Sequence, residues 1–357
     1  MKKLRVFYNI NQLPIFQNRM YDTESEAKNC PKGDVRLVED LQTGLVYNAS
    51  FRPELMEYDE HYQNEQAVSQ LFQEHLESVY KIIERSMGKE DLVEVGCGKG
   101  YFLELLLKHG VEITGFDPAY EGINTRIERH YFDKSFGTKA NGLILRHVLE
   151  HIQEPVNFLM RLKEANGGSG LIYIEVPNFD WICSKRAWFD IFYEHANYFR
   201  LADFDRMFDK VVESGALFGG QYIYVVAELG SVKIPKYDKQ TLVDFPQDFL
   251  HFPIKQNRAE QSRTEQNNGA IWGGASKGVI FSLIKMREGI IFNTVIDINP
   301  AKQGKFLAAT GLKVQSPDEA LPTLASGADI WVMNSNYLDE IKKISGNTYN
   351  YICIDNE

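Results

Sequence analysis

The chain has 357 residues, of which 44% are hydrophobic and 25% are charged, and its 39 basic and 49 acidic side chains give a formal net charge of −10. This length is enough for two domains, and a single small domain is not expected. The ordinary globular composition excludes a disulfide scaffold, a collagen-like chain and wholesale disorder. The acidic balance, without a local basic patch, argues against duplex nucleic acid or an anionic membrane as the main partner.

Four cysteines, Cys30, Cys97, Cys183 and Cys353, lie far apart and form no CxxC pair. We therefore expect free thiols in a reducing cytoplasm. The N-terminal residues are too polar for a signal-peptide core, and we find no run of about 18 apolar residues. These features predict a soluble, cytoplasmic protein without a membrane partner.

In chain order, residues 1–60 predict an irregular or small β-rich lead-in. Residues 64–88 carry apolar side chains at spacings of three and four, which is typical of an amphipathic helix. Short apolar runs then alternate with helix-like stretches, which predicts a parallel sheet with helices on both faces. The predicted strands cover residues 92–95, 113–116, 142–145 and 171–176.

A polar, glutamine-rich stretch at residues 256–268 is typical of a connector or an exposed helix. The same alternation returns after it on a smaller scale, with predicted strands at 270–272, 294–298 and 328–333. We therefore expect an α/β protein in three parts, which cover residues 1–62, 63–255 and 256–357.

The clearest motif follows the first predicted strand of the middle part, where Glu94 precedes Gly96, Cys97, Gly98 and Gly100 and a helix begins near Tyr101. Glycines permit a tight strand-to-helix turn and a close approach of ligand to backbone. The next strand ends at Asp117 and Pro118, where an α/β nucleotide site places a carboxylate for ribose hydroxyls. The last glycine of the pyrophosphate fingerprint is missing, because Tyr101 follows Gly100.

This turn resembles the first motif of class I S-adenosylmethionine-dependent methyltransferases, whose ligand has no phosphate. Residues 143–152 and 172–178 resemble the family's fourth and fifth strands. The resemblance implies a Rossmann-like domain with S-adenosylmethionine as cofactor, held by Glu94, Gly96, Cys97, Gly98, Gly100, Asp117, Pro118 and His147. The pair His147 and His151 has a spacing that could bind a metal on a helix start, but we favour the alternative that it binds none.

Over nearly its whole length the chain also resembles the sugar-nucleotide C-methyltransferases of deoxysugar pathways, which methylate a carbon beside a 4-keto group. The matching runs cover residues 51–62, 192–199, 272–278 and 295–305. The resemblance implies a small N-terminal lead-in, a central methyltransferase domain and a C-terminal second Rossmann-like domain on the substrate side.

Three departures from this family concern the acceptor. Members bind zinc through N-terminal cysteine pairs, but the second pair falls here on Asp40 and Thr43 and the first is missing, so the lead-in must hold together without the metal. Phe192 stands where the family has a catalytic tyrosine, with Tyr193 one place later. The run at 306–314 diverges from the usual segment.

Methylation of carbon requires a base beside the C–H bond and a donor beside the ketone oxygen. We expect His195 to act as the base, since imidazole titrates near neutral pH. Glu194 would orient it or bind a hydroxyl, and Tyr193 or Tyr198 would donate to a carbonyl. On the substrate side we place Phe192, Tyr198, Lys277 and Asn334.

Three alternatives stay open at this point. An N- or O-methyltransferase would act on a related small molecule without a strong base. A catalytically silent protein would bind S-adenosylmethionine without turnover, and a nicotinamide oxidoreductase would use the turn at 273–278 with Asp297. The acceptor, the methylated atom, its stereochemistry and the oligomeric state are left open.

Overall fold

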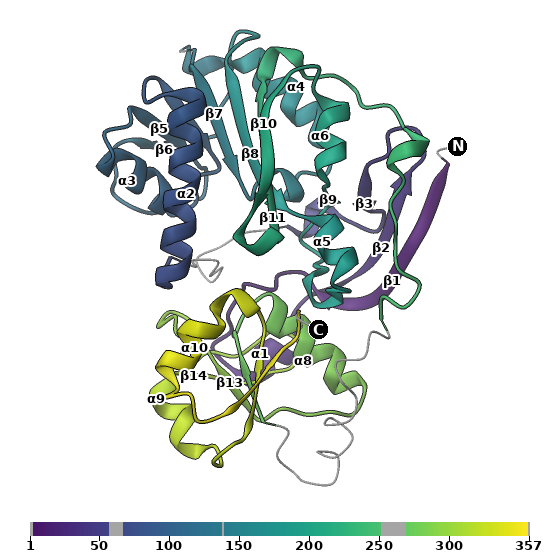
Figure 1. Cartoon of the computed structure of the whole chain (residues 1–357), viewed down its shortest axis with the longest axis vertical. Coiled ribbons are helices and arrows are strands. Elements are labelled where there is room, and N and C mark those ends of the chain that lie inside the picture. The colour runs from purple at the N-terminus through teal and green to yellow at the C-terminus, as the bar shows by residue number, and fades with distance from the viewer. Residues whose placement is uncertain (1–2, 57–66, 138, 251–268, 356–357) are drawn as a thin grey trace.

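The computed structural model describes residues 3–56, 67–137, 139–250 and 269–355. Two α/β units lie one above the other, and an N-terminal sheet lies beside the upper unit and extends down to the top of the lower one (Figure 1). Among these residues, none of the helices has the length and apolar character needed to cross a bilayer. The expected part boundaries at 62/63 and 255/256, and the connector at 256–268, fall outside the described ranges.

The upper unit is built on a seven-stranded sheet in the order β10-β11-β8-β7-β4-β5-β6. Every neighbouring pair from β8 to β6 is parallel, whereas β11 is antiparallel to both β8 and β10. The chain runs outward from β4 in both directions, so the switch point of this sheet lies between β4 and β7. The strands are β4 (Leu92–Val95), β5 (Ile113–Phe116), β6 (Ile127–Glu128), β7 (Gly142–Arg146), β8 (Leu171–Pro177), β10 (Val211–Leu217) and β11 (Tyr222–Glu228).

Helices cover both faces of this sheet, because successive side chains of a buried strand point to opposite faces. Ile144 of β7 packs in the cluster that holds α2 and α3, whereas its neighbours Leu143 and Leu145 pack with α4 and α6. Both faces are therefore buried, as the continuous apolar strands require. The covering helices are α2 (Gln70–Met87), α3 (Tyr101–Lys108), α4 (Pro155–Ala165) and α6 (Leu201–Met207), whereas α5 (Phe179–Ser184) packs in the cluster of the N-terminal strands.

The lower unit repeats this plan with a five-stranded parallel sheet in the order β14-β13-β12-β15-β16. Helix α8 packs on one face, and α9 and α10 pack on the other. The elements are β12 (Ala270–Trp272), α8 (Lys277–Arg287), β13 (Thr294–Ile296), β14 (Val314–Gln315), α9 (Pro317–Ala320), β15 (Asp329–Val332), α10 (Leu338–Ile344) and β16 (Asn350–Cys353).

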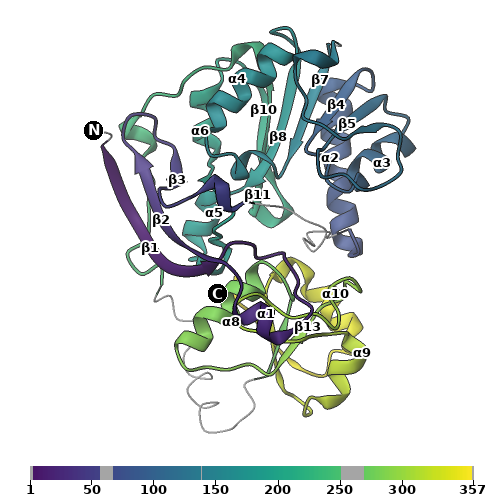
Figure 2. The same ribbon diagram turned by 180° about the vertical axis from the view of Figure 1, so that it is seen from behind.

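The N-terminal sheet, β1-β2-β3-β9, takes its last strand from residues 197–198 of the upper unit. After β1, the chain reaches the lower unit through α1, which the reverse view shows clearly (Figure 2). Tyr21 bridges Phe306, and Ala309 donates its backbone N–H to the carbonyl of Ala27 at 2.8 Å. The other elements are β1 (Leu4–Pro14), α1 (Glu24–Lys28), β2 (Lys32–Asp40), β3 (Val46–Asn48) and β9 (Asn197–Tyr198).

Asp40 and Thr43 occupy the positions where the resembling family has zinc-binding cysteines; Asp40 ends β2, and Thr43 lies in the turn that leads to β3. Asp40 accepts the backbone N–H of Gln42 on Oδ1 at 2.8 Å, and Thr43 accepts that of Leu45 on Oγ1 at 3.3 Å. Hydrogen bonds therefore hold this turn.

The predicted fold class is confirmed, with parallel sheets in both α/β units and β-strands in the lead-in. The strands predicted at 92–95, 113–116 and 270–272 have these bounds, and the described part of the helix predicted at 64–88 begins at Gln70. All four cysteines are free, as expected. The expected helix start at His147 is wrong, because His147 has a φ of +52° and only Leu149–His151 form a 3-10 turn.

Candidate active site

A cavity of about 390 Å³ lies between the two α/β units. It is bounded by segments that follow β4, β7 and β8 of the upper sheet and β12, β13 and β15 of the lower one. These are the carboxyl ends of the strands, where open α/β sheets bind their ligands. Its size is typical of a small-molecule site.

The predicted glycine turn forms one wall of this cavity. Gly96, Cys97 and Gly98 line it, and Gly96 has a φ of +75°. A Cβ at position 96 would lie 2.6 Å from Cγ2 of Val148, whereas one at Gly98 would meet nothing within 4 Å. Gly96 is therefore needed for packing, and Gly98 leaves space for a ligand against the backbone.

Asp117 stands behind this turn and fixes it. Its Oδ2 accepts the backbone N–H of Gly98 at 2.7 Å, and its Oδ1 accepts that of Ala119 at 2.9 Å. Each carboxylate oxygen keeps a further lone pair for a ligand. Asp117, Pro118 and Gly100 are themselves not among the residues that border the cavity.

Glu94 is a buried carboxyl at the cavity wall, only 3% exposed. Burial raises its pKa to about 8, although the Arg146 guanidinium opposes this shift. Its Oε2 is buried without a hydrogen-bond partner among the described residues. A buried acceptor of this kind suits a cationic ligand group, which would also favour its ionised form.

Arg146, whose charge acts on Glu94, belongs to a buried network of charged side chains. Arg146 donates to Glu175 Oε2 at 3.1 Å, and His75 of α2 lies 2.8 Å from Glu175 Oε1. Although burial opposes it, Arg146, His147 and His75 hold the pKa of Glu175 well below its ordinary value. His147 lies 3.3 Å from Glu150 and 3.4 Å from Glu175, and these carboxylates outweigh burial and raise its pKa to about 9.

Only part of the segment 192–198, which was predicted to carry the catalytic residues, borders the cavity. His195 and Phe192 line the cavity, whereas Tyr193, Glu194 and Tyr198 do not. Burial, together with His151 and His147, holds the pKa of His195 well below its ordinary value. The imidazole is therefore neutral at neutral pH.

The other three polar side chains have partners behind the wall. The Tyr193 hydroxyl accepts the backbone N–H of Arg52 at 3.1 Å, and the Tyr198 hydroxyl donates to the carbonyl of Phe192 at 2.9 Å. Glu194 Oε1 lies 3.4 Å from the backbone nitrogen of Gln17. In this arrangement they position the segment, and the expectation that Tyr193 or Tyr198 donates to a substrate carbonyl does not fit it.

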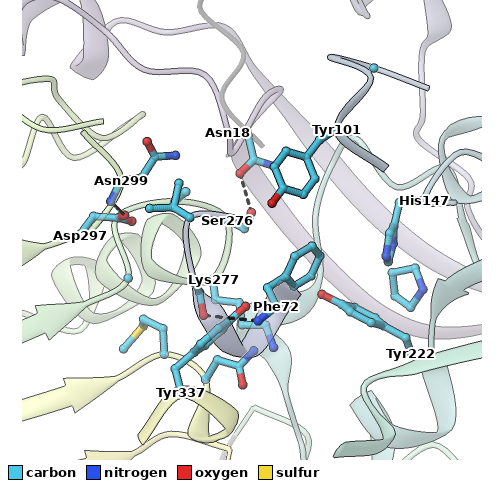
Figure 3. A pocket seen from close by; sticks show the side chains of 18 of the residues that line it. Asn18, Phe72, Tyr101, His147, Tyr222, Ser276, Lys277, Asp297, Asn299 and Tyr337 are labelled. Carbon is cyan, nitrogen blue, oxygen red and sulfur yellow. Dashed lines mark hydrogen bonds between the residues drawn. The ribbon is translucent and has the colours of Figure 1, made fainter. Parts of the chain in front are cut away.

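The lower unit supplies the opposite wall, where Asp297 and Asn299 face His147 and Tyr222 across the pocket (Figure 3). Gly274 donates its backbone N–H to Asp297 Oδ2 at 2.8 Å, which parallels the contact between Gly98 and Asp117. Lys302 lies 3.3 Å from the same Asp297 oxygen. Both sheets thus present a glycine turn fixed by an aspartate to one cavity.

Lys277 and Asn334, predicted on the substrate side, both line the cavity, and both contact Gln221 of the upper unit. Lys277 Nζ lies 3.1 Å from Gln221 Oε1 and 3.1 Å from Asp190 Oδ2. These contacts join the two units at the cavity edge.

Several aromatic and polar residues of the cavity were not predicted as site residues. Phe72 lies on a predicted helix face whose apolar periodicity could have suggested burial, but Tyr222 follows a turn that gave no signal. The unpredicted lining residues include Asn18, Phe72, Tyr101, Glu150, Tyr222, Lys302 and Tyr337, whereas His151 and Asp297 had been considered only in the metal-pair and nicotinamide alternatives.

Comparison with known proteins finds matches for the part of the chain around the glycine turn. No curated protein matches the chain at a significant level. The chain is similar to the solved 1,6-didemethyltoxoflavin N1-methyltransferase of Burkholderia thailandensis, at 14% identity over 46% of this chain and 79% of that one, with a TM-score of 0.34. It is similar to the magnesium protoporphyrin IX methyltransferase of Synechocystis, at 16% identity over 44% and 82%, with a TM-score of 0.34. Residues 57–211, which contain the glycine turn and β4 to β8, match the family model of a methyltransferase domain.

Proposed function

We propose that the chain transfers a methyl group from S-adenosylmethionine to a small molecule held in the cavity between the two α/β units. The observation that carries the proposal is the placement of Glu94 and the Gly96–Gly98 turn on the wall of that cavity, inside the segment that matches a methyltransferase domain. The second unit forms the opposite wall, so that donor and acceptor would meet in one cavity.

Residues already in place would bind the cofactor. S-adenosylmethionine supplies a methyl group activated by its sulfonium charge, so the protein must mainly position the acceptor in line with it. The open backbone at Gly98 admits the ligand, and Asp117, already fixed by two backbone N–H groups, has lone pairs for the ribose hydroxyls. Glu94 would face a cationic part of the ligand.

For the acceptor we propose a nucleotide-linked keto-sugar that is methylated on carbon. His195 supports this choice, because it lies at the cavity wall and its buried imidazole is neutral and can accept the proton of the C–H bond. Phe192 would pack on the acceptor, and Lys277 and Asn334 would contact its polar part. Glu194 and Tyr193 would act as positioning residues, since their polar atoms have partners behind the wall.

Methylation of nitrogen or oxygen is the second candidate. It needs no strong base, and the low pKa of His195 makes this imidazole a weak one. A silent protein that only binds S-adenosylmethionine is the third. The three proposals differ in what happens at the acceptor carbon.

The first test is calorimetric titration with S-adenosylhomocysteine and, separately, with NAD. Micromolar binding of S-adenosylhomocysteine alone is expected, and binding of NAD alone would contradict the proposal and favour the lower turn. The second test follows deuterium exchange beside the keto group of a nucleotide 4-keto-sugar. Exchange should occur in the native protein and be lost in His195→Gln, while the exposed His130→Gln serves as the matched control. Methyl transfer without exchange would favour an N- or O-acceptor.

A further inference from the structure

Three residues of the cavity lie close together and have side chains of the types that coordinate metal ions. Glu150 and His151 end the 3-10 turn after β7, and His195 comes from the segment before β9. One donor atom from each lies within 4.8 Å of the other two. All three line the cavity, so the group is open to a ligand on one side.

Two members of this trio bury polar atoms without partners. Glu150 Oε2 and His195 Nδ1 have no hydrogen-bond partner among the described residues, although Glu150 is only 2% exposed and His195 only 8%. Buried polar atoms are nearly always paired, because an unpaired one loses its hydration without compensation. A cation coordinated through these two atoms would compensate for that loss.

A second set of contacts orients the trio. His147 Nδ1 lies 3.3 Å from Glu150 Oε1, and His151 Nδ1 donates to the backbone carbonyl of Glu194 at 3.0 Å. The second contact leaves Nε2 of His151 as the acceptor atom of its ring. Histidine ligands in metal sites are usually fixed in this way by a carbonyl or a carboxylate on the other ring nitrogen.

We propose that Glu150, His151 and His195 bind one divalent transition-metal ion, with Zn²⁺ as the reference ion. Two imidazoles and one carboxylate form the donor set of zinc sites that keep a position open. Zinc bonds of about 2.0–2.2 Å hold ligand atoms about 3.4 Å apart, so the trio closes by side-chain shifts of about 1 Å. The site differs from the His147 and His151 pair of the sequence motif, because the fold replaces His147 by His195.

The ion has a consequence for the proposed methyl transfer, in which His195 accepts a proton. A neutral imidazole has one lone pair, which cannot bind an ion and a proton together. When His195 coordinates the ion, it is no longer available as a base. We therefore expect the bound ion to inhibit proton exchange, whereas ion binding itself requires neither the methyl donor nor the acceptor.

The test titrates the metal-free full chain with Co²⁺, followed by visible absorption, and then displaces Co²⁺ with Zn²⁺ in the calorimeter. One equivalent should bind, and Glu150→Gln and His151→Gln should each weaken the affinity by about 100-fold or more, since loss of an orienting partner alone costs about 10–100-fold. The control His130→Gln removes an exposed imidazole and should bind as the native chain does.

Three results would overturn the site: no binding, equal binding in the trio variants, or a thiolate-to-cobalt band that places the ion on a cysteine. Circular dichroism and S-adenosylhomocysteine titration report whether each variant folds. His151→Gln serves if Glu150→Gln does not fold, because His151 is only partly buried. These binding results remain interpretable even if no acceptor is ever methylated, so failure of the metal site and failure of the proposed function can be told apart.

Discussion

Lys277 and Asp190 form an ion pair across the two α/β units, with 3.1 Å between Nζ and Oδ2 and side chains that are 14% and 13% exposed. Lys277 begins α8, and Asp190 ends the 3-10 turn Trp188–Asp190 beside the cavity. Burial raises the pKa of Asp190 and the Lys277 charge opposes that shift, so the carboxylate depends on its partner.

Removing one partner of this pair should therefore destabilise the protein. Asp190→Asn and Lys277→Gln should each lower the free energy of unfolding by about 2–4 kcal/mol, because the remaining group stays buried without its partner. The double variant should lose less than the sum, which urea unfolding of all four proteins measures. The exposed pair Lys134 and Glu164, at 2.9 Å, provides the control cycle, with about 0–1 kcal/mol expected. Additive losses at Lys277 and Asp190 would show that the pair is not coupled.

Asp117→Ala should weaken binding of S-adenosylmethionine and S-adenosylhomocysteine by about 1–3 kcal/mol, because the variant loses charge-assisted hydrogen bonds to the ligand and the anchor of Gly98. Isothermal calorimetry gives the difference. Asp133→Ala is a matched control, since that carboxylate also accepts the backbone N–H two residues on, whereas Asp117 in addition accepts that of Gly98 in the glycine turn. Unchanged affinity in a folded Asp117→Ala protein would contradict the cofactor site.

Glu94→Gln should remove a pH dependence of S-adenosylmethionine binding. The Glu94 pKa of about 8 means that the carboxyl is mostly protonated at pH 7, whereas a cationic ligand favours the carboxylate. We compare the affinity of the native chain with that of Glu94→Gln at each pH. As the pH increases toward 8, this ratio should rise by up to about tenfold per pH unit, and above pH 8 it should stay constant. Parallel affinity profiles of the two proteins between pH 6 and 9 would refute this role.

The same substitution should change stability in the opposite sense. The pKa of Glu94 in the folded protein lies above the ordinary carboxyl value of 4.5. The free energy of unfolding should therefore decrease as the pH rises from 4.5 through about 8. Glu94→Gln cannot ionise, so its melting temperature relative to the native chain should be higher at pH 9 than at pH 5. A difference that does not vary with pH would contradict the raised pKa.

Glu175→Gln should be among the most damaging single changes in the upper unit, with a loss of about 3–5 kcal/mol, because it leaves the buried Arg146 without its carboxylate. The pKa of Glu175 is depressed, so its contribution is present above its ordinary value of 4.5 and is lost as pH falls through the lower folded pKa. Urea unfolding at pH 7 measures the loss. Glu228→Gln, from an exposed pair with Lys210 at 3.0 Å, is expected to change stability by less than about 1 kcal/mol.

The central parallel strands β4, β5, β7, β8, β12, β13 and β15 could be predicted because buried strands are continuous apolar runs bounded by turns, whereas β11 and β16 were missed. The strand β10 could not be predicted, since its residues alternate between exposed and half-exposed and carry no apolar face. The two-residue strands β6 and β14 are too short to give any pattern. The pairing of β9 with β3 could not be predicted either, because these strands are far apart in the sequence.

The glycine turn could be predicted because its backbone conformation restricts the residue type. Side-chain direction in an irregular segment has no such signature, which is why Tyr193 and Tyr198 were expected at the substrate and lie behind the wall. The meeting of Glu150 with His195 depends on how the segment before β9 crosses the 3-10 turn. No spacing rule along one chain contains that information.

The way the N-terminal segment spans both units determines the order in which the chain can fold. Leu13, Phe16 and Met20 share a core with Phe281 and Leu307 of the lower unit, and Tyr21 pairs with Phe306. These contacts join residues roughly 300 positions apart in the sequence. Because closing so long a loop has a high entropic cost, we expect them to form late in folding. During synthesis, the part of this segment that packs on the lower unit stays without those partners until residues beyond 300 have been made. We therefore expect the docking of the last unit against the N-terminal segment to be the slowest and most aggregation-sensitive step of folding.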